Sequence, residues 1–173
     1  MTVAVTATVH TVIDTPVGPL TLTAEDGHLT GIYFAIHRLR HRVPDFGLAV
    51  AGLPVFAETA RQLGEYFDRQ RQDFDLPLAP RGEPFQQSVW ALLREIPYGA
   101  TRSYGDLARD LGQPGAAQAV GVANGANPIS IVIPCHRVIG ADGSLTGYAG
   151  GLDRKRFLLA LEQPPAEEAG RLF

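Results

Sequence analysis

The chain of 173 residues contains one cysteine, one methionine and one lysine. A single cysteine excludes an internal disulfide and any zinc site built from several cysteines. The sequence also lacks a long hydrophobic run and a positively charged leader with a cleavage site, so we expect no signal peptide and no membrane span. An unpaired thiol fits a reducing compartment, and we therefore expect a cytoplasmic protein.

Histidine offers little basis for a metal site. His37 and His41 stand four residues apart and could form a ligand pair on one helix face. No cysteine follows to complete such a site, and we predict neither a metal nor a cofactor.

The composition is that of a globular protein, with 45 % apolar and 19 % charged residues. The length allows one large domain or two small ones. The net charge of −3 argues weakly against nucleic acid as a partner. That acidity is uneven, because residues 1–80 carry six basic against nine acidic side chains, whereas residues 81–162 carry eight against seven. Any contact with DNA must therefore come from a local patch in the second half.

The first half predicts a small antiparallel sheet covered by one helix. Alternating apolar and β-branched residues predict three strands, Val5–Asp14, Leu20–Ala24 and Leu29–Ala35. Asp26-Gly27 is a hairpin signal between the second and third. The stretch 37–52 is expected to be a loop, and apolar spacing after Pro54 predicts a helix that reaches Asp68. Prolines and a glycine near residues 78–83 predict a linker.

The second half predicts mainly helices. Their expected ranges are Pro84–Glu95, Tyr104–Leu111, Ala116–Asn124 and Asp153–Glu162, with Phe157, Leu158 and Leu161 of the last helix facing inward. We therefore expect an N-terminal scaffold domain over residues 1–80, a functional domain over 81–163 and a tail over 164–173.

The second and third of these helices have the outline of a helix-turn-helix, because a short glycine-containing turn joins them. An ordinary helical hairpin remains an alternative on spacing alone. The helix Ala116–Asn124 carries small side chains on nearly every face, which would allow close approach to a partner backbone such as a DNA groove.

The stretch 131–139 contains the lone Cys135 behind three apolar residues and Pro134. His136 and Arg137 follow at once, and this electropositive setting favours the nucleophilic thiolate. The alternative is a small buried hydrophobic residue with no chemistry. His136 could assist Cys135 only if the chain is turned or helical there, or through a water, since neighbours on a strand point to opposite faces.

Pro134-Cys135-His136-Arg137-Val138 resembles the signature of the O6-alkylguanine-DNA alkyltransferases. The similarity is strong from residue 84 to 162 and weaker near residues 16–20. Other segments that resemble the family, in the same order, are Arg102-Ser103-Tyr104-Gly105, Asn127-Pro128, Gly147-Tyr148-Ala149-Gly150-Gly151 and the closing Leu-Ala-Leu-Glu162.

The resemblance implies an α+β fold: a ribonuclease H-like antiparallel three-stranded sheet with a helix, then a mainly helical domain with a helix-turn-helix. It also implies that the protein binds double-stranded DNA carrying O6-alkylguanine, flips the damaged base out and moves its alkyl group onto Cys135. Because no second cysteine could remove the adduct, we expect one irreversible turnover per molecule. A monomer in solution is expected, while cooperative binding along DNA and activity on O4-alkylthymine stay open.

The resemblance also assigns roles to individual residues. Cys135 would be the nucleophile, His136 would take its proton through a water, and Glu162 would orient His136 as an acid does in a triad. Asn127 would be a hinge that bridges the recognition helix and the cysteine segment. The carbonyls of Cys135 and Val138 would receive the exocyclic amine of the base. The other implied DNA or base contacts are Arg102, Tyr104, Tyr148, Ala149 and Lys155.

Two positions depart from the family pattern. Gln118 stands where the family usually has an arginine that fills the gap left by the flipped base. Glutamine has no charge and stacks less well, so we expect weaker DNA affinity and slower repair. Ser130 stands where some relatives have proline, which would open one wall of the pocket.

Two other functional classes remain as alternatives. A cysteine hydrolase could use Cys135, His136 and Glu162, although adjacent cysteine and histidine is an unusual order for one. A lesion-sensing DNA-binding protein with weak or no transfer would not need the thiol.

Overall fold

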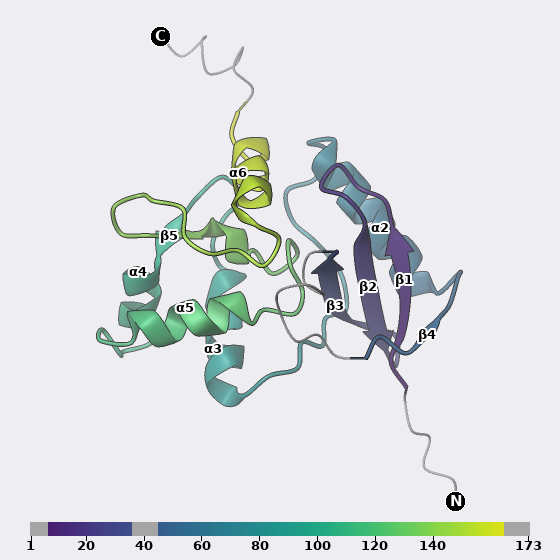
Figure 1. Cartoon of the computed structure of the whole chain (residues 1–173), viewed down its shortest axis with the longest axis horizontal. Coiled ribbons are helices and arrows are strands. Elements are labelled where there is room, and N and C mark those ends of the chain that lie inside the picture. The colour runs from purple at the N-terminus through teal and green to yellow at the C-terminus, as the bar shows by residue number, and fades with distance from the viewer. Residues whose placement is uncertain (1–6, 36–44, 165–173) are drawn as a thin grey trace, which may run out of the picture.

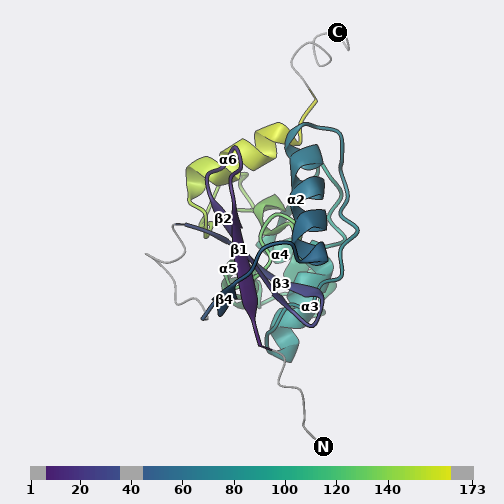
Figure 2. The same ribbon diagram turned by 90° about the vertical axis from the view of Figure 1, so that its right-hand side faces the viewer.

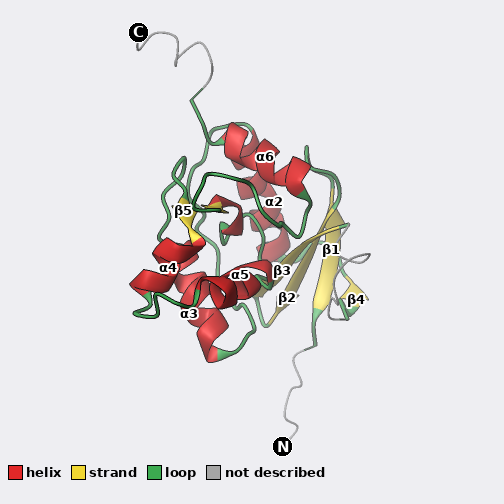
Figure 3. Cartoon of the chain, turned by 60° about the vertical axis from the view of Figure 1, so that its left-hand side comes forward, coloured by secondary structure: helices red, strands yellow, loops and turns green. Residues whose placement is uncertain are grey.

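The computed structural model describes residues 7–35 and 45–164 and has a mixed α+β fold, as predicted. A sheet lies on one side of the molecule and most of the helices on the other (Figures 1 and 3). The strands are β1 (Val9–Ile13), β2 (Leu20–Glu25), β3 (His28–Phe34), β4 (Leu48–Ala49), β5 (Arg102–Ser103) and β6 (Val138–Ile139). The helices are α2 (Pro54–Phe67), α3 (Pro84–Leu93), α4 (Tyr104–Asp110), α5 (Ala117–Gly125) and α6 (Leu152–Leu161), with a 3-10 turn over Cys135–Arg137.

The N-terminal sheet contains the predicted antiparallel β1, β2 and β3, in the order β3-β2-β1-β4. The β2–β3 hairpin turns at Asp26 and Gly27, whose positive φ values of 49° and 74° fit the mirror-image turn expected of this dipeptide. The prediction of three strands was wrong by one, because β4 pairs with β1 in parallel. A strand of two residues is too short to carry a periodic signal, and its stretch was expected to be a loop. His37 and His41 lie outside the described residues.

Helix α2 lies against the sheet (Figure 2) and buries one apolar face. Pro54 begins it, where the missing amide hydrogen costs nothing. Its buried face includes Phe56, Leu63 and Tyr66, which belong to the same core as Leu22 of β2. Each such side chain contributes about 1.5–3 kcal/mol relative to an exposed one.

In the helical half, a capping box begins α4. The Ser103 hydroxyl accepts from the Asp106 amide at 3.0 Å, and the Asp106 carboxylate accepts from the Ser103 amide at 2.9 Å. The small-residue helix α5 is held by Trp90 of α3, which is 2 % exposed and donates its indole N–H to the Ala123 carbonyl at 2.8 Å. Tertiary contacts therefore compensate for the weak helix propensity of α5.

The two halves share one continuous core, and the edge of β3 is their seam. The Ile32 amide donates to the Pro128 carbonyl at 2.9 Å, which pairs β3 with the segment that leads to Cys135. The sheet therefore supports the segment that leads to Cys135 through this backbone hydrogen bond at the edge of β3.

Helix α6 corrects one expectation. Leu158 and Leu161 face the core as predicted, but Phe157 is 41 % exposed. The buried face of α6 instead includes the aliphatic stem of Lys155.

None of the helices in the described ranges has both the length and the apolar character needed to cross a membrane. Over residues 7–35 and 45–164, no three His, Cys, Asp or Glu side chains gather in a way that could hold a metal ion.

Candidate active site

Two consecutive tight turns deliver the chain to Cys135. The Val132 amide donates to the Ser130 carbonyl at 2.9 Å around Ile131, whose φ is 73°. The Cys135 amide donates to the Ile133 carbonyl at 2.8 Å around Pro134, with φ −82° and ψ 65°, an inverse γ-turn that suits the proline ring. A β-branched residue at positive φ costs about 1–3 kcal/mol, and such strain persists only where the surroundings enforce it.

Asn127 enforces this path, and it is 5 % exposed. Its amide Nδ2 donates to the Ile133 carbonyl at 2.8 Å, and its Oδ1 accepts from the Ile129 amide at 3.0 Å. One side chain thus spans both ends of the double turn.

The 3-10 turn over Cys135–Arg137 meets the condition under which His136 could act on its neighbour, because the chain is helical there. Cys135 is 4 % exposed. Burial raises the pKa of its thiol, and a hydrogen bond from Asn127 and the charge of Lys155 only partly oppose this. The expectation that neighbouring cations favour thiolate in the resting protein was therefore wrong, since desolvation outweighs them.

Glu162, the residue that ends α6, lies at the centre of a buried hydrogen-bond network and is 3 % exposed. Its Oε2 accepts from His136 Nε2 at 2.7 Å and from the Tyr66 hydroxyl at 2.6 Å. Arg137 donates Nε to Oε1 at 2.8 Å and Nη2 to Oε2 at 3.0 Å. The carboxylate is therefore a well-satisfied buried anion.

These contacts set the protonation states of the pair. Burial alone would raise the pKa of Glu162, but hydrogen bonds from His136 and Arg137 hold that pKa at about 2. Burial lowers the pKa of His136 despite the nearby carboxylate. Because Glu162 only accepts, Nε2 of His136 carries the hydrogen and Nδ1 has the free lone pair. Nδ1 is buried without a protein partner among the described residues and can accept a proton.

The N-terminal half contributes two side chains to this site that sequence reasoning missed. Tyr66 of α2 reaches Glu162, and Phe34 of β3 packs edge-on against Tyr148 at a ring distance of 5.6 Å. Both residues read in the sequence as ordinary core positions, so no local signal distinguished them. Arg137 was recognised only as a nearby charge, and its pairing with Glu162 was not foreseen.

Of the expected base-contact residues, Lys155 and Tyr148 lie close enough to Cys135 for electrostatic interaction with it. Ser130 is fully buried, and its hydroxyl, like that of Tyr148, has no protein partner in the described part of the chain. Lys155 is fully buried and donates Nζ to the Val138 carbonyl at 2.7 Å and the Thr146 carbonyl at 2.8 Å. Ala149, which follows Tyr148, is 8 % exposed.

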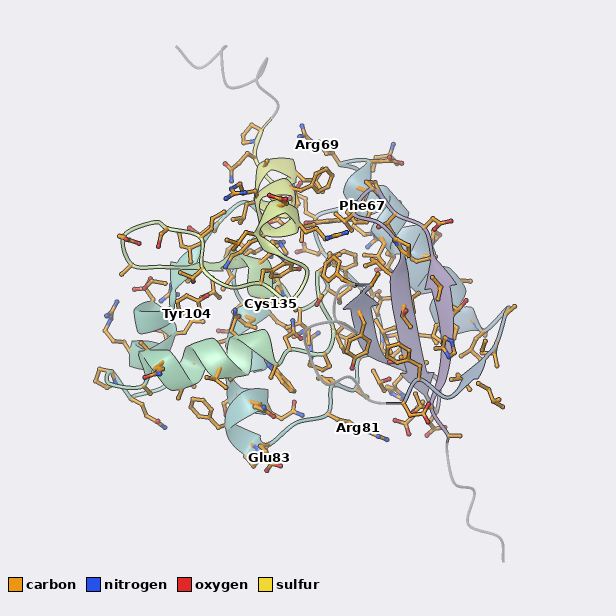
Figure 4. All side chains as sticks on the ribbon, in the orientation of Figure 1. Phe67, Arg69, Arg81, Glu83, Tyr104 and Cys135 are labelled. Carbon is orange, nitrogen blue, oxygen red and sulfur yellow. The ribbon has the colours of Figure 1, made fainter. Side chains whose placement is uncertain are left out.

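The remaining expected contacts lie farther out. Figure 4 shows Cys135 in the middle of the molecule and Tyr104 nearer its edge. The Tyr104 hydroxyl accepts from Thr146 Oγ1 at 2.9 Å, which joins α4 to the loop of Tyr148. Gln118 is exposed on α5. Arg102 is half-buried and bonded to Asp110 at 3.0 Å, so a carboxylate already balances its charge.

Comparison with known proteins agrees with this arrangement. The model of the 6-O-methylguanine DNA methyltransferase DNA-binding domain matches residues 84–164, and that of the ribonuclease-like domain of the same family matches residues 8–80. This chain belongs to the 6-O-methylguanine DNA methyltransferase family.

Relatives in this methyltransferase family cover nearly the whole chain. The methylated-DNA–protein-cysteine methyltransferase of Methanosarcina acetivorans is 48 % identical over 153 residues, which cover 88 % of this chain and 97 % of the relative. That of Mycobacterium tuberculosis is 48 % identical over 165 residues, covering 93 % and 96 %. The crystal structure of M. tuberculosis OGT in complex with DNA has a TM-score of 0.82 at 48 % identity, covering 88 % of this chain and 92 % of that one.

Proposed function

We propose that this protein repairs DNA by transferring the alkyl group of O6-alkylguanine in a duplex irreversibly to its own Cys135. The observation that carries the proposal is the buried contact in which Glu162 fixes His136, the neighbour of the lone Cys135 in the chain, and leaves His136 Nδ1 without a protein partner in the described residues. Relatives named for this reaction, at 48 % identity over most of their length, support the same reading. No cofactor enters the proposal.

The chemistry is a nucleophilic displacement at carbon. His136 Nδ1 takes the thiol proton through a water, which overcomes the raised pKa of Cys135. The sulfur attacks the alkyl carbon, an S–C bond forms, and the C–O6 bond breaks with its electron pair left on the guanine oxygen. A proton returned to the base restores guanine. Glu162 stabilises the imidazolium that forms between these steps.

Buried Cys135 can reach a base only if the nucleotide leaves the helix stack, so we propose base flipping. Helices α4 and α5 would act as a helix-turn-helix, with α5 against the duplex and Gln118 filling the gap. Exposed Gln118 and Val122, which is 69 % exposed, favour that face. Tyr104 would crowd the target phosphate, and Arg102 would contact the backbone.

For the base itself, we propose that Tyr148 and Ser130 line the pocket and that the Ala149 amide lies near O6. The Cys135 and Val138 carbonyls would face the exocyclic amine, and Lys155 would hold the Val138 carbonyl in place. Asn127 would keep the cysteine segment and α5 in register.

We propose that residues 1–80 form a scaffold domain, residues 81–163 carry DNA binding and transfer, and residues 164–173 form a tail. A reducing cytoplasm would suit the free thiol, and a monomer would suffice, since every proposed catalytic side chain comes from one chain.

The deciding experiment mixes the protein with a duplex oligonucleotide containing one O6-methylguanine and weighs the protein by mass spectrometry. We expect a gain of one methyl group located on Cys135, at most one per molecule, and none in Cys135→Ser. Continued turnover on excess DNA would contradict stoichiometric transfer.

The same variant separates the alternatives. A lesion sensor would keep its full activity as Cys135→Ser, and a cysteine hydrolase would turn over a simple ester repeatedly. Neither alternative is favoured by a specific feature of the site.

A further inference from the structure

Thr146, in the loop between β6 and α6, contacts Tyr104 of α4 through its side chain. Its hydroxyl donates to the Tyr104 hydroxyl at 2.9 Å, across 42 residues of sequence. Thr146 is exposed and Tyr104 is half-buried, so water competes for this bond and its contribution to the stability of the fold is small. Its main consequence is therefore one of position, because it fixes the polar end of Tyr104 to the loop.

The backbone of Thr146 is held at the proposed base pocket by Lys155. The Lys155 Nζ donates to the Thr146 carbonyl at 2.8 Å and to the Val138 carbonyl at 2.7 Å. Lys155 is fully buried, and hydrogen bonds from a charged donor are stronger than neutral ones. One cation thus fixes both ends of the loop that runs from Val138 to Thr146.

The backbone and ring of Tyr104 are held as well. Tyr104 follows β5 directly, and β5 pairs with β6 at Val138. Its ring lies against α5, where a Cβ placed on Gly121 would be 3.6 Å from Tyr104 Cδ1. A closed circuit of contacts therefore runs from Tyr104 through Thr146 and the Lys155 ammonium back to β6 and β5. The circuit sets the position of the Tyr104 hydroxyl relative to the Val138 carbonyl, one of the two that would face the base.

The direction of the bond leaves Tyr104 with a free hydrogen. A phenol has one hydrogen to donate and can also accept, and here it accepts from Thr146. Its own hydrogen can therefore go to an acceptor on the DNA, and phosphate oxygens are the acceptors that proteins contact most often in duplexes. Accepting one hydrogen bond also strengthens a hydroxyl as the donor of the next.

We propose that Thr146 is a positioning residue for alkyl transfer: it holds the Tyr104 hydroxyl, with its hydrogen free, at a set distance from the Val138 carbonyl. The phosphate and the base of one extruded nucleotide are then bound at the separation that places the alkyl carbon at Cys135. This rests on the proposed transfer from duplex DNA. Thr146 acts through the phosphate contact, so it matters for a nucleotide in DNA and not for the free base, which the pocket receives without that contact.

The test is a double-mutant cycle on a duplex containing O6-methylguanine, measured as single-turnover transfer rates at saturating DNA. Thr146→Val keeps the shape of the side chain but removes its hydroxyl, and it should slow transfer by roughly three- to tenfold, the effect of one hydrogen bond. Thr146→Ser keeps the hydroxyl and should keep the parent rate. In the Tyr104→Phe background, Thr146→Val should cause no further loss, because the bond has already lost its acceptor.

Free O6-methylguanine separates positioning of Tyr104 from support of the loop. The parent and Thr146→Val should be methylated on Cys135 by the free base at equal rates, since no phosphate is present to be contacted. Ser144→Ala is the matched control on the duplex, because the Ser144 hydroxyl lies in the same loop but acts on Asp142. This control should keep the parent rate.

An unchanged duplex rate in Thr146→Val, a loss that persists in the Tyr104→Phe background, or a slow Thr146→Ser would each overturn the proposal. Slower transfer from the free base in Thr146→Val would also overturn it, because the hydroxyl would then only support the pocket. A parent active on the duplex but inert toward the free base would do the same, since the pocket is proposed to act without the phosphate. A parent that takes no methyl group from either substrate gives a different result and would overturn the proposed function, and this proposal with it.

Discussion

Tyr66→Phe is the sharpest test of whether the N-terminal half takes part in the active site. The change removes one hydroxyl, which donates to Glu162 Oε2 at 2.6 Å from a fully buried position. The ring remains, and with it the edge-on packing against Phe67 and Tyr98. The effects should therefore come from the lost hydrogen bond and not from a cavity.

The expected magnitude follows from the charge of the acceptor. A hydrogen bond to a buried charged group contributes about 1.5–3 kcal/mol, so the free energy of unfolding at pH 7 should fall by about 2 kcal/mol. With one donor fewer, the pKa of Glu162 rises from about 2. Oε2 also becomes a stronger acceptor for His136 Nε2–H, so the pKa of His136 rises and the acidic limb of the pH–rate profile moves to higher pH.

These effects are measured by urea unfolding at pH 7 and by single-turnover transfer rates. The rates are followed between pH 5 and 8, an interval of about three units around the usual histidine pKa. Tyr98→Phe is the matched control, because its hydroxyl donates to the Leu161 carbonyl at 3.2 Å. If Tyr66→Phe gave the parent's pH–rate profile and lost no more stability than Tyr98→Phe, the assignment of Tyr66 to the active site would be refuted.

Gln118→Arg should raise both duplex affinity and transfer rate, because guanidinium stacks better and adds a charge; no gain in a single-turnover assay would count against the expected role of α5. Arg137→Met should lower the free energy of unfolding by about 3–5 kcal/mol, since it breaks a buried pair with Glu162. The exposed Arg109→Met should change it by less than about 1 kcal/mol, and equal losses in urea unfolding would contradict this contrast. Acidification should destabilise the fold, because the pKa values of His136 and Glu162 lie below their ordinary 6.5 and 4.5, so the unfolded chain binds more protons. The Glu162 part, about 3 kcal/mol, is present above pH 4.5 and is lost as the pH falls toward 2; stability independent of pH between 7 and 3 would rule it out.

Local signals were enough for most of the secondary structure. Pro54 begins α2, Ser103 caps α4, and Asp26-Gly27 turns the β2–β3 hairpin, because each depends on the backbone preferences of a few adjacent residues. The failures were Phe157, which is exposed, and the two-residue strands β4, β5 and β6, whose pairing partners lie far away in the chain.

The site residues likewise divide into those with a local sequence signal and those without one. A motif in the sequence pointed to Cys135, His136, Asn127 and Glu162, and the structure buries all four. Glu162 bonds His136, and Asn127 bonds the segment that leads to Cys135. Tyr66 had no signal, because a tyrosine on the apolar face of a helix looks the same whether or not its hydroxyl meets a carboxylate.

The amino-acid sequence by itself determined the α+β class, the lone nucleophile and the family pattern, because composition, periodicity and motifs are properties of neighbouring residues. Only the tertiary structure decided that burial raises the pKa of the Cys135 thiol and that Glu162 is shared by His136, Arg137 and Tyr66. Those properties arise from desolvation and from contacts across as many as 96 residues of sequence, which no local pattern encodes.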